Sequence, residues 1–195
     1  EAPVALRVNP DVEAKTPHHY TATGHKTTKF GIPYEDAERM YRLAADLPGI
    51  RVRGVDVHIG SQIIDVEPYR LAVTRVLELV DRLRGAGITM EFIDVGGGFG
   101  VSYDADRSPE PADFADGLVP LLAASGLRVV FEPGRFIVGP AGVLLTRVLY
   151  VKQMGGKTFL ITDAGMTDLL RPSHYSSYHR VDPAVLDPSR ETVHV

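Results

Sequence analysis

Three segments that could carry chemistry each follow directly on an apolar, strand-like run. His58 follows GVDV, Gly96-Gly97-Gly98 follow FIDV, and Glu132 follows LRVVF. Successive residues without a Cβ let backbone N–H groups converge on an anion, so the glycines suggest a phosphate site. A plain strand-to-helix turn is the alternative for the same glycines. The glycines have neither the Lys-Ser/Thr of a Walker loop nor the spacing of a dinucleotide-binding fold.

Glu132 is the residue whose position demands a partner. A carboxylate directly after an apolar run is costly to desolvate unless a cationic or protonated group lies beside it. Arg135, three residues further on, is one candidate. The other is a protonated ring nitrogen of a bound cofactor, which a carboxylate would hold in its electron-withdrawing form.

Two further pairs of residues suggest ligand binding. His58 and Ser61 lie in HIGSQ, where the hydroxyl could bind an oxyanion; a structural histidine is the alternative. Arg171 and Tyr175 lie four residues apart and could recognise a carboxylate; a surface loop with a helix-stabilising pair is the alternative, which the residues alone favour.

The histidines near the N-terminus do not predict a metal site. His18, His19 and His25 lack the spacing of metal ligands, and no carboxylate spacing supports them. The segment from His18 to Gly31 has no helical or strand period and is predicted to be a long loop that covers or lines the site.

Periodicity predicts the elements that must position these residues. Strands are expected at Val4–Val8, Arg51–Ile59, Met90–Val95 and Leu127–Phe131, with helices between them at Tyr34–Leu47, Glu67–Arg84 and Ala112–Ala124. This β-α-β-α-β-α-β order fits successive units of a parallel sheet or barrel. In a barrel, the carboxyl ends of the strands carry the active site, which is where His58, the glycines and Glu132 fall.

The pattern changes near Gly139-Pro140. Gly142–Gln153 and Lys157–Thr162 are strand-like and are separated only by Met154-Gly155-Gly156, which predicts an antiparallel hairpin. We therefore expect a parallel α/β domain over residues 1–139 and the start of an antiparallel β domain over residues 140–195.

Composition narrows the class of protein. The 195 residues include 21 Lys and Arg against 25 Asp and Glu, a formal net charge of −4, which argues against electrostatic binding to nucleic acid or membrane. No apolar stretch is long enough to span a membrane, and no signal peptide is recognisable, so a cytoplasmic protein is expected. The chain has no cysteine, which excludes disulfides and thiolate chemistry within it.

The motifs occur in an order that resembles a known enzyme family. The series LRVNP, TGHKTTKFGI, HIGSQI, DVGGGFG, FEPGR and DAGMTDLLRPSHY is similar to the pyridoxal-phosphate decarboxylases of the alanine-racemase-like fold type, most closely to members that act on diaminopimelate. The resemblance spans nearly the whole chain. It implies the last four strands of an eight-stranded (β/α)8 barrel, followed by the start of a β domain.

The resemblance also implies roles for individual residues. Glu132 would hold the pyridine nitrogen of pyridoxal 5'-phosphate, and His58 would stack on its ring. The phosphate would be held by the glycine segment, by the Gly134-Arg135 backbone and by Ser61, and the distal carboxylate of an amino-acid substrate would be bound by Arg135, Arg171 and Tyr175. The family also implies a homodimer with shared active sites.

Two functional elements of the family have no counterpart in this sequence. The lysine that forms the Schiff base would precede it, and the Cys-Glu-Ser segment would follow Val195. We therefore expect activity only in a longer parent chain. The function implied is decarboxylation of meso-diaminopimelate to L-lysine. The alternatives are a decarboxylase of ornithine, arginine or carboxynorspermidine, and a non-catalytic homologue that acts as a binding or regulatory protein.

Overall fold

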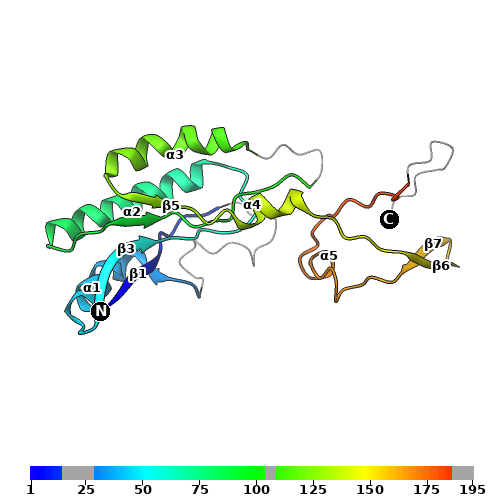
Figure 1. Cartoon of the computed structure of the whole chain (residues 1–195), viewed down its shortest axis with the longest axis horizontal. Coiled ribbons are helices and arrows are strands. Elements are labelled where there is room, and N and C mark those ends of the chain that lie inside the picture. The colour runs from blue at the N-terminus through cyan, green and yellow to red at the C-terminus, as the bar shows by residue number, and fades with distance from the viewer. Residues whose placement is uncertain (15–28, 104–108, 186–195) are drawn as a thin grey trace. The chain divides into compact units, whose positions relative to one another are not determined.

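The computed structural model describes residues 1–14, 29–103 and 109–185. These residues form two compact units (Figure 1): one comprises Glu1–Val101 with the described residues up to Pro140, and the other comprises Ser102, Tyr103 and the described residues from Ala141 onward. Each unit is considered by itself below. His18, His19 and His25, and most of the predicted covering loop, lie outside the described residues.

The first unit is built on a five-stranded parallel sheet with the order β2-β1-β3-β4-β5. Its strands are β1 (Ala2–Asn9), β2 (Ile32–Pro33), β3 (Ile50–Asp56), β4 (Phe92–Asp94) and β5 (Arg128–Val130), and its longer helices are α1 (Tyr34–Asp46), α2 (Glu67–Gly85) and α3 (Pro111–Ser125). The prediction of a parallel α/β fold is confirmed. Strands β1, β3, β4 and β5 are neighbours in chain order, as in successive units of a barrel, while the two-residue strand β2 pairs with the other side of β1.

Strands β3, β4 and β5 end earlier than periodicity predicted, whereas β1 runs one residue past the predicted Val8. Single backbone hydrogen bonds continue past the ladder, from Val57 N–H to the Asp94 carbonyl (3.0 Å) and from Val95 N–H to the Val130 carbonyl (2.9 Å). Beyond these bonds the segment that follows each strand leaves the regular ladder. The apolar run therefore extends into the turn that carries the polar residue, and hydrophobicity alone does not mark where pairing stops.

The two faces of the sheet differ in character. Register aligns Leu6, Val55, Ile93 and Val129 across four strands, and all four belong to or pack against the hydrophobic core. One position further along, the register aligns Arg7, Asp56, Asp94 and Val130. Because successive side chains point to opposite faces of a strand, the charged residues share the face turned away from that core.

Helix α2 supplies much of this core. Its buried stripe includes Val73, Val76 and Val80, while Leu77 is only partly buried. Near the start of the helix, the ring of Tyr69 stacks on Phe99, with ring centroids 4.8 Å apart. This contact joins α2 to the glycine segment that follows β4.

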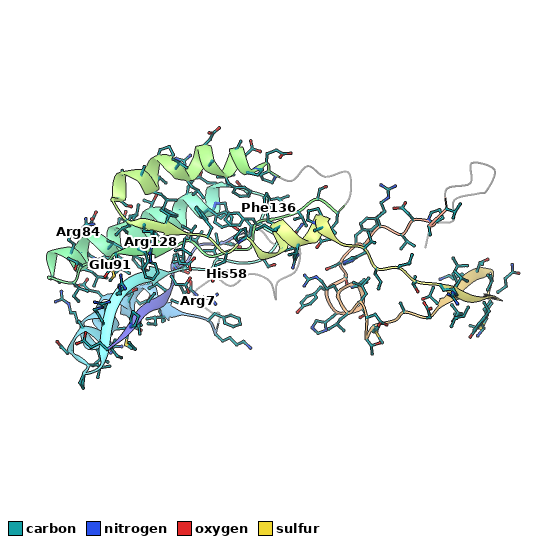
Figure 2. The ribbon with its side chains drawn as sticks, viewed as in Figure 1. Arg7, His58, Arg84, Glu91, Arg128 and Phe136 are labelled. Carbon is teal, nitrogen blue, oxygen red and sulfur yellow. The ribbon has the colours of Figure 1, made fainter. Side chains whose placement is uncertain are left out.

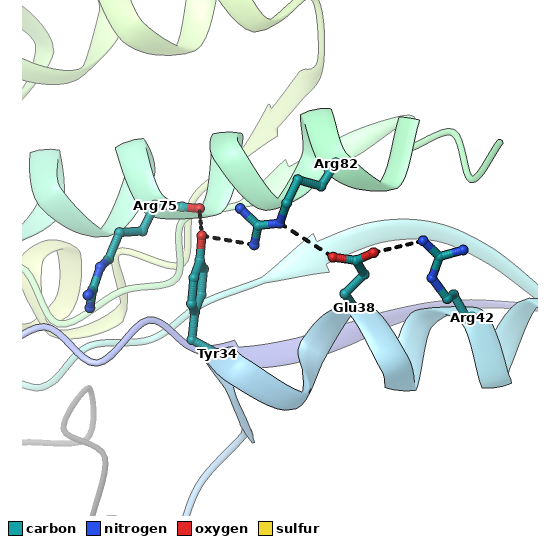
Figure 3. Close-up of polar contacts among 5 residues, drawn as sticks. All are labelled: Tyr34, Glu38, Arg42, Arg75 and Arg82. Atoms are coloured by element: carbon teal, nitrogen blue, oxygen red, sulfur yellow. Dashed lines mark hydrogen bonds and ion pairs between the residues drawn. The ribbon is translucent and has the colours of Figure 1, made fainter. Parts of the chain in front are cut away.

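Polar side chains join α1 to α2 on the outside of the unit (Figure 3). The hydroxyl of Tyr34 donates to the Arg75 carbonyl (2.8 Å) and accepts from Arg82 Nη2 (3.2 Å), and Glu38 forms ion pairs with both Arg42 and Arg82. Exposed ion pairs of this kind contribute little stability individually. Their effect is to fix how the two helices lie along each other.

The second unit contains the predicted hairpin. Strands β6 (Val148–Met154) and β7 (Lys157–Thr162) pair antiparallel through Gly155-Gly156, whose φ values of 61° and 75° suit a two-residue turn. The first strand begins at Val148, later than the predicted Gly142, and Met154 pairs with Lys157 instead of lying in the link. The unit also holds the short helix α5 (Arg171–Tyr175).

Candidate functional site

The carboxyl ends of β3, β4 and β5 bring three of the predicted segments together. Glu132 N–H donates to the Gly96 carbonyl (2.8 Å), and Gly97 N–H donates to His58 Nδ1 (3.3 Å). His58, the glycine segment and Glu132 are thus neighbours at one edge of the sheet. This is the edge where parallel α/β enzymes carry their chemistry.

Each of the three glycines lies against the backbone of another segment. A Cβ would come within 2.2 Å of the Val57 carbonyl oxygen at Gly96, within 2.1 Å of the Glu132 oxygen at Gly97 and within 2.0 Å of the Gly60 oxygen at Gly98. No side chain fits at such distances. The glycines are therefore required for packing between the strand ends, a reason that the sequence did not reveal.

The N–H groups of this segment are partly used within the protein. Gly96 N–H donates to Asp94 Oδ1 (2.9 Å), and Gly97 N–H is the donor to His58. The segment therefore orients the neighbouring histidine, whatever else it binds. The predicted phosphate contact at these glycines remains a prediction.

His58 is held at its ring and at its backbone. Its Nδ1 accepts the Gly97 N–H, which requires the neutral tautomer with the proton on Nε2. Burial lowers the pKa of His58, and the nearby Arg7 guanidinium lowers it further. Arg7 also donates to the His58 carbonyl oxygen (3.2 Å), and Figure 2 shows the two residues close together. The ring is thus a neutral, fixed plane at the strand ends.

Glu132 and Arg135 lie where β5 leads into the short helix α4 (Gly134–Val138), which periodicity did not predict. The Glu132 residue is exposed. Arg135 donates to Ser61 Oγ (3.1 Å) and to Gln62 Oε1 (3.3 Å), so its guanidinium ties α4 to the turn after His58. Ser61 therefore lies in the same site as the histidine.

The charged row formed by Arg7, Asp56 and Asp94 was missed by sequence reasoning. Burial raises the pKa of Asp56 to about 6, and the negative charge of Asp94 adds to this effect against the opposing charge of Arg7. In the part of the chain that the structure describes, Asp56 Oδ1 is buried and has no hydrogen-bond partner. The signal was available, because a charged residue interrupts each of the apolar runs LRV, VDV and IDV.

Replacing Asp56 with asparagine should stabilise the fold above pH 6. The raised pKa means that ionised Asp56 costs folding free energy, in full above about pH 6 and not at all below the ordinary value of 3.8. Urea unfolding at pH 8 should therefore show Asp56→Asn to be about 1–2 kcal/mol more stable than the unchanged protein, after allowance for partial solvent screening. The gain should fall to nearly zero at pH 4, and a gain of equal size at both values would contradict ionisation as its cause.

Arg171 and Tyr175 lie in helix α5 of the second unit. The Arg171 guanidinium carbon is 4.8 Å from the centre of the Tyr175 ring. Within the described residues, Arg171 Nε is buried and has no hydrogen-bond partner. The two side chains are thus neighbours as their spacing predicted, and their role toward a carboxylate remains a prediction.

Other classes of site were also sought. Among the described residues, no helix has the length and apolar character needed to cross a membrane. Within the same ranges, no three His, Asp or Glu side chains gather as a metal site would require.

A neutral histidine, a carboxylate and packed glycines lie together at the carboxyl ends of the parallel strands, as in the active sites of parallel α/β enzymes. The sequence model described as "Pyridoxal-dependent decarboxylase, pyridoxal binding domain" matches residues 1–139. The chain belongs to this family of pyridoxal-dependent decarboxylases.

Individual relatives are similar over nearly the whole chain. It is 50% identical over 178 residues to a diaminopimelate decarboxylase of Pseudomonas aeruginosa, and 43% identical over 194 residues to one of Aquifex aeolicus. These alignments cover 91% and 99% of this chain but 43% and 46% of the relatives. The chain therefore spans about half the length of the curated relatives it matches.

A solved structure has a similar fold. The diaminopimelate decarboxylase of Helicobacter pylori, determined in complex with L-lysine, superposes with a TM-score of 0.87 at 41% identity. The match covers 92% of this chain and 45% of that one.

Proposed function

We propose that this chain forms part of a decarboxylase that uses pyridoxal 5'-phosphate to convert meso-diaminopimelate to L-lysine. The observation that carries the proposal is the placement of Glu132 beside Gly96 and His58 at the ends of three parallel strands. Family membership and the named relatives support both the cofactor and the substrate.

The donor set at the strand ends fits the cofactor. Glu132 offers an exposed carboxylate to a pyridine nitrogen, and the neutral ring of His58 offers a flat surface for stacking. Ser61, Gly98 and the Arg135 backbone could donate hydrogen bonds to a phosphate, whereas Gly134 N–H already donates to the Glu132 carbonyl (2.8 Å). Gly96 and Gly97 shape the loop before Gly98. The residues present are therefore of the types that this group requires.

When bound, the cofactor supplies a protonated ring that draws electron density from the carbon losing carbon dioxide. Glu132 contributes by holding the proton on the ring nitrogen through its negative charge. His58 would stack on the cofactor ring and fix its plane. Because the imidazole is neutral, it would add no positive charge to the stacked face of the cofactor. The task of this chain is therefore to orient the ring and to fix its protonation.

Substrate recognition is assigned to three residues. Arg135, Arg171 and Tyr175 would bind the distal carboxylate of the substrate, since a guanidinium and a phenol suit an acidic end group. Ornithine and arginine have a cationic group at that end. The pair in α5 therefore favours diaminopimelate over the substrates of the sister enzymes.

The wider architecture follows from the same family. We infer an eight-stranded barrel of which residues 1–139 supply four successive strands, with residues 140–195 beginning a β domain. We also infer a cytoplasmic homodimer with shared active sites. The neighbour order of β1, β3, β4 and β5 supports the barrel.

The test is carbon dioxide release from the intact purified protein supplied with pyridoxal 5'-phosphate. We expect release from meso-diaminopimelate, with L-lysine as product, and none from ornithine, arginine or carboxynorspermidine. Release from one of these three amino acids, and not from diaminopimelate, would identify that amino acid as the substrate instead. Cofactor binding without release from any of them would identify a non-catalytic homologue.

A further inference from the structure

A polar layer lies on the sheet directly before the strand-end site. Arg7, Asp56 and Asp94 are register partners on β1, β3 and β4, and they project from the same face. The next residues with the same orientation are those at the strand ends, among them His58, two positions after Asp56. The layer therefore adjoins the residues that are proposed to meet the cofactor.

Asp94 and the ring of His58 each accept a hydrogen bond from one of two consecutive backbone amides. Asp94 Oδ1 accepts Gly96 N–H at 2.9 Å, and the next amide along the chain, Gly97 N–H, reaches His58 Nδ1 at 3.3 Å. With a φ of +75° at Gly96, the backbone turns so that the first amide faces Asp94 and the second faces His58. If the Asp94 acceptor were lost, the Gly96 turn would have no side chain to hold its N–H group.

We propose that Asp94 is a positioning residue, which fixes the Gly96 turn and thereby the orientation and tautomer of His58. The proposal rests on the proposed function only in taking His58 as the residue that contacts the cofactor ring. Asp94 acts through the backbone and does not itself touch the reacting atoms. Arg7 completes the arrangement by donating to the His58 carbonyl oxygen (3.2 Å).

The charges around Asp94 agree with this role. Arg7 on β1, Asp56 on β3 and Glu132 after β5 are the charged groups that interact across this layer. Asp94 accepts a backbone N–H, whereas Asp56 Oδ1 has no hydrogen-bond partner among the described residues. Burial and the charge of Asp94 raise the pKa of Asp56.

The experiment compares Asp94→Ala with Asp94→Asn in the intact protein. The asparagine oxygen can still accept Gly96 N–H, so only the alanine variant loses the acceptor. The ring nitrogens of His58 are followed by ¹⁵N NMR without cofactor, and the Kd for pyridoxal 5'-phosphate is measured by absorbance titration. Asp113→Ala is the matched control, because Asp113 accepts Glu110 N–H (2.8 Å) at the start of α3 in the same manner but away from the site.

We expect Asp94→Ala to shift the His58 ring signals from the pure Nε2–H tautomer and to weaken cofactor binding by about tenfold, as the loss of one hydrogen bond would. Asp94→Asn should retain the tautomer and stay within about threefold in Kd, as should Asp113→Ala. If Asp94→Ala does not fold, Asp94→Leu takes its place, since leucine has the same branching of side-chain heavy atoms and no acceptor.

Unchanged His58 signals in the folded alanine or leucine variant would overturn the proposal, as would an asparagine variant that behaves like alanine. These outcomes are separate from failure of the proposed function. If the unchanged protein does not bind pyridoxal 5'-phosphate, the proposed function is wrong, and the His58 signals still decide whether Asp94 positions the ring.

Discussion

Glu132→Ala in the intact protein should lower the rate of carbon dioxide release by two or more orders of magnitude. The loss follows because the carboxylate supplies a fixed negative charge at the ring nitrogen, where positive charge must be held while the bond to carbon dioxide breaks. Removing one preorganised electrostatic contact of this kind typically costs a factor of about 10² to 10³. Single-turnover measurements with saturating cofactor would separate the chemical step from binding.

Two further variants show whether the negative charge is the cause. Glu132→Gln keeps the size and an acceptor oxygen but carries no charge, so it should lose nearly as much activity as Glu132→Ala. Glu91→Ala removes a glutamate at the opposite end of the sheet, where it pairs with Arg53, and should leave the rate within about twofold. A Glu132→Gln variant with normal turnover would show that the charge is not needed.

Gly97→Ala should destabilise the protein by about 3 kcal/mol or more and displace Glu132. Its Cβ would lie 2.1 Å from the Glu132 carbonyl oxygen, and a backbone atom cannot yield as a flexible side chain can. Overpacking usually costs about 1–3 kcal/mol, and a clash with backbone belongs at or beyond the upper end. Urea unfolding measures the free energy, and the cofactor absorbance titration reports whether the site survives.

Gly85→Ala is the matched control for this substitution. Gly85 is the last residue of α2 and has no atom within 4 Å of an added Cβ, so alanine there should be neutral or slightly stabilising. If Gly97→Ala were as stable as Gly85→Ala, the strand ends would have to be more loosely packed than the structure shows.

The order of the elements could be predicted from sequence because the helices and strands have clear periods. In α2, Val73, Val76 and Val80 recur at helical spacing and are all buried. The Gly155-Gly156 turn lies in the short link that separates two apolar runs. The carboxyl ends of the strands were less predictable. Val57 and Val95 are as apolar and as buried as strand residues, but they lie past the last paired position.

The candidate site was predictable in its residues but not in their connections. His58, Ser61, Glu132 and Arg135 stand out by type and position, and the structure places them around the same strand ends. Asp94 and Arg7 did not stand out, because their roles depend on register between strands that are far apart in sequence. The packing role of the glycines likewise depends on which backbone atoms meet them.

The Gly155-Gly156 turn has a consequence for the order in which the chain folds. Hairpin β6–β7 closes over two residues, whereas the β1–β3 pair must first bring together residues as far apart as Ala2 and Ile50. Isolated hairpins form within about 1–10 μs, and pairing between distant strands is slower because the intervening chain must first lose conformational entropy. The hairpin should therefore form early, and the edge of the sheet that carries Glu132 and His58 should assemble among the last parts.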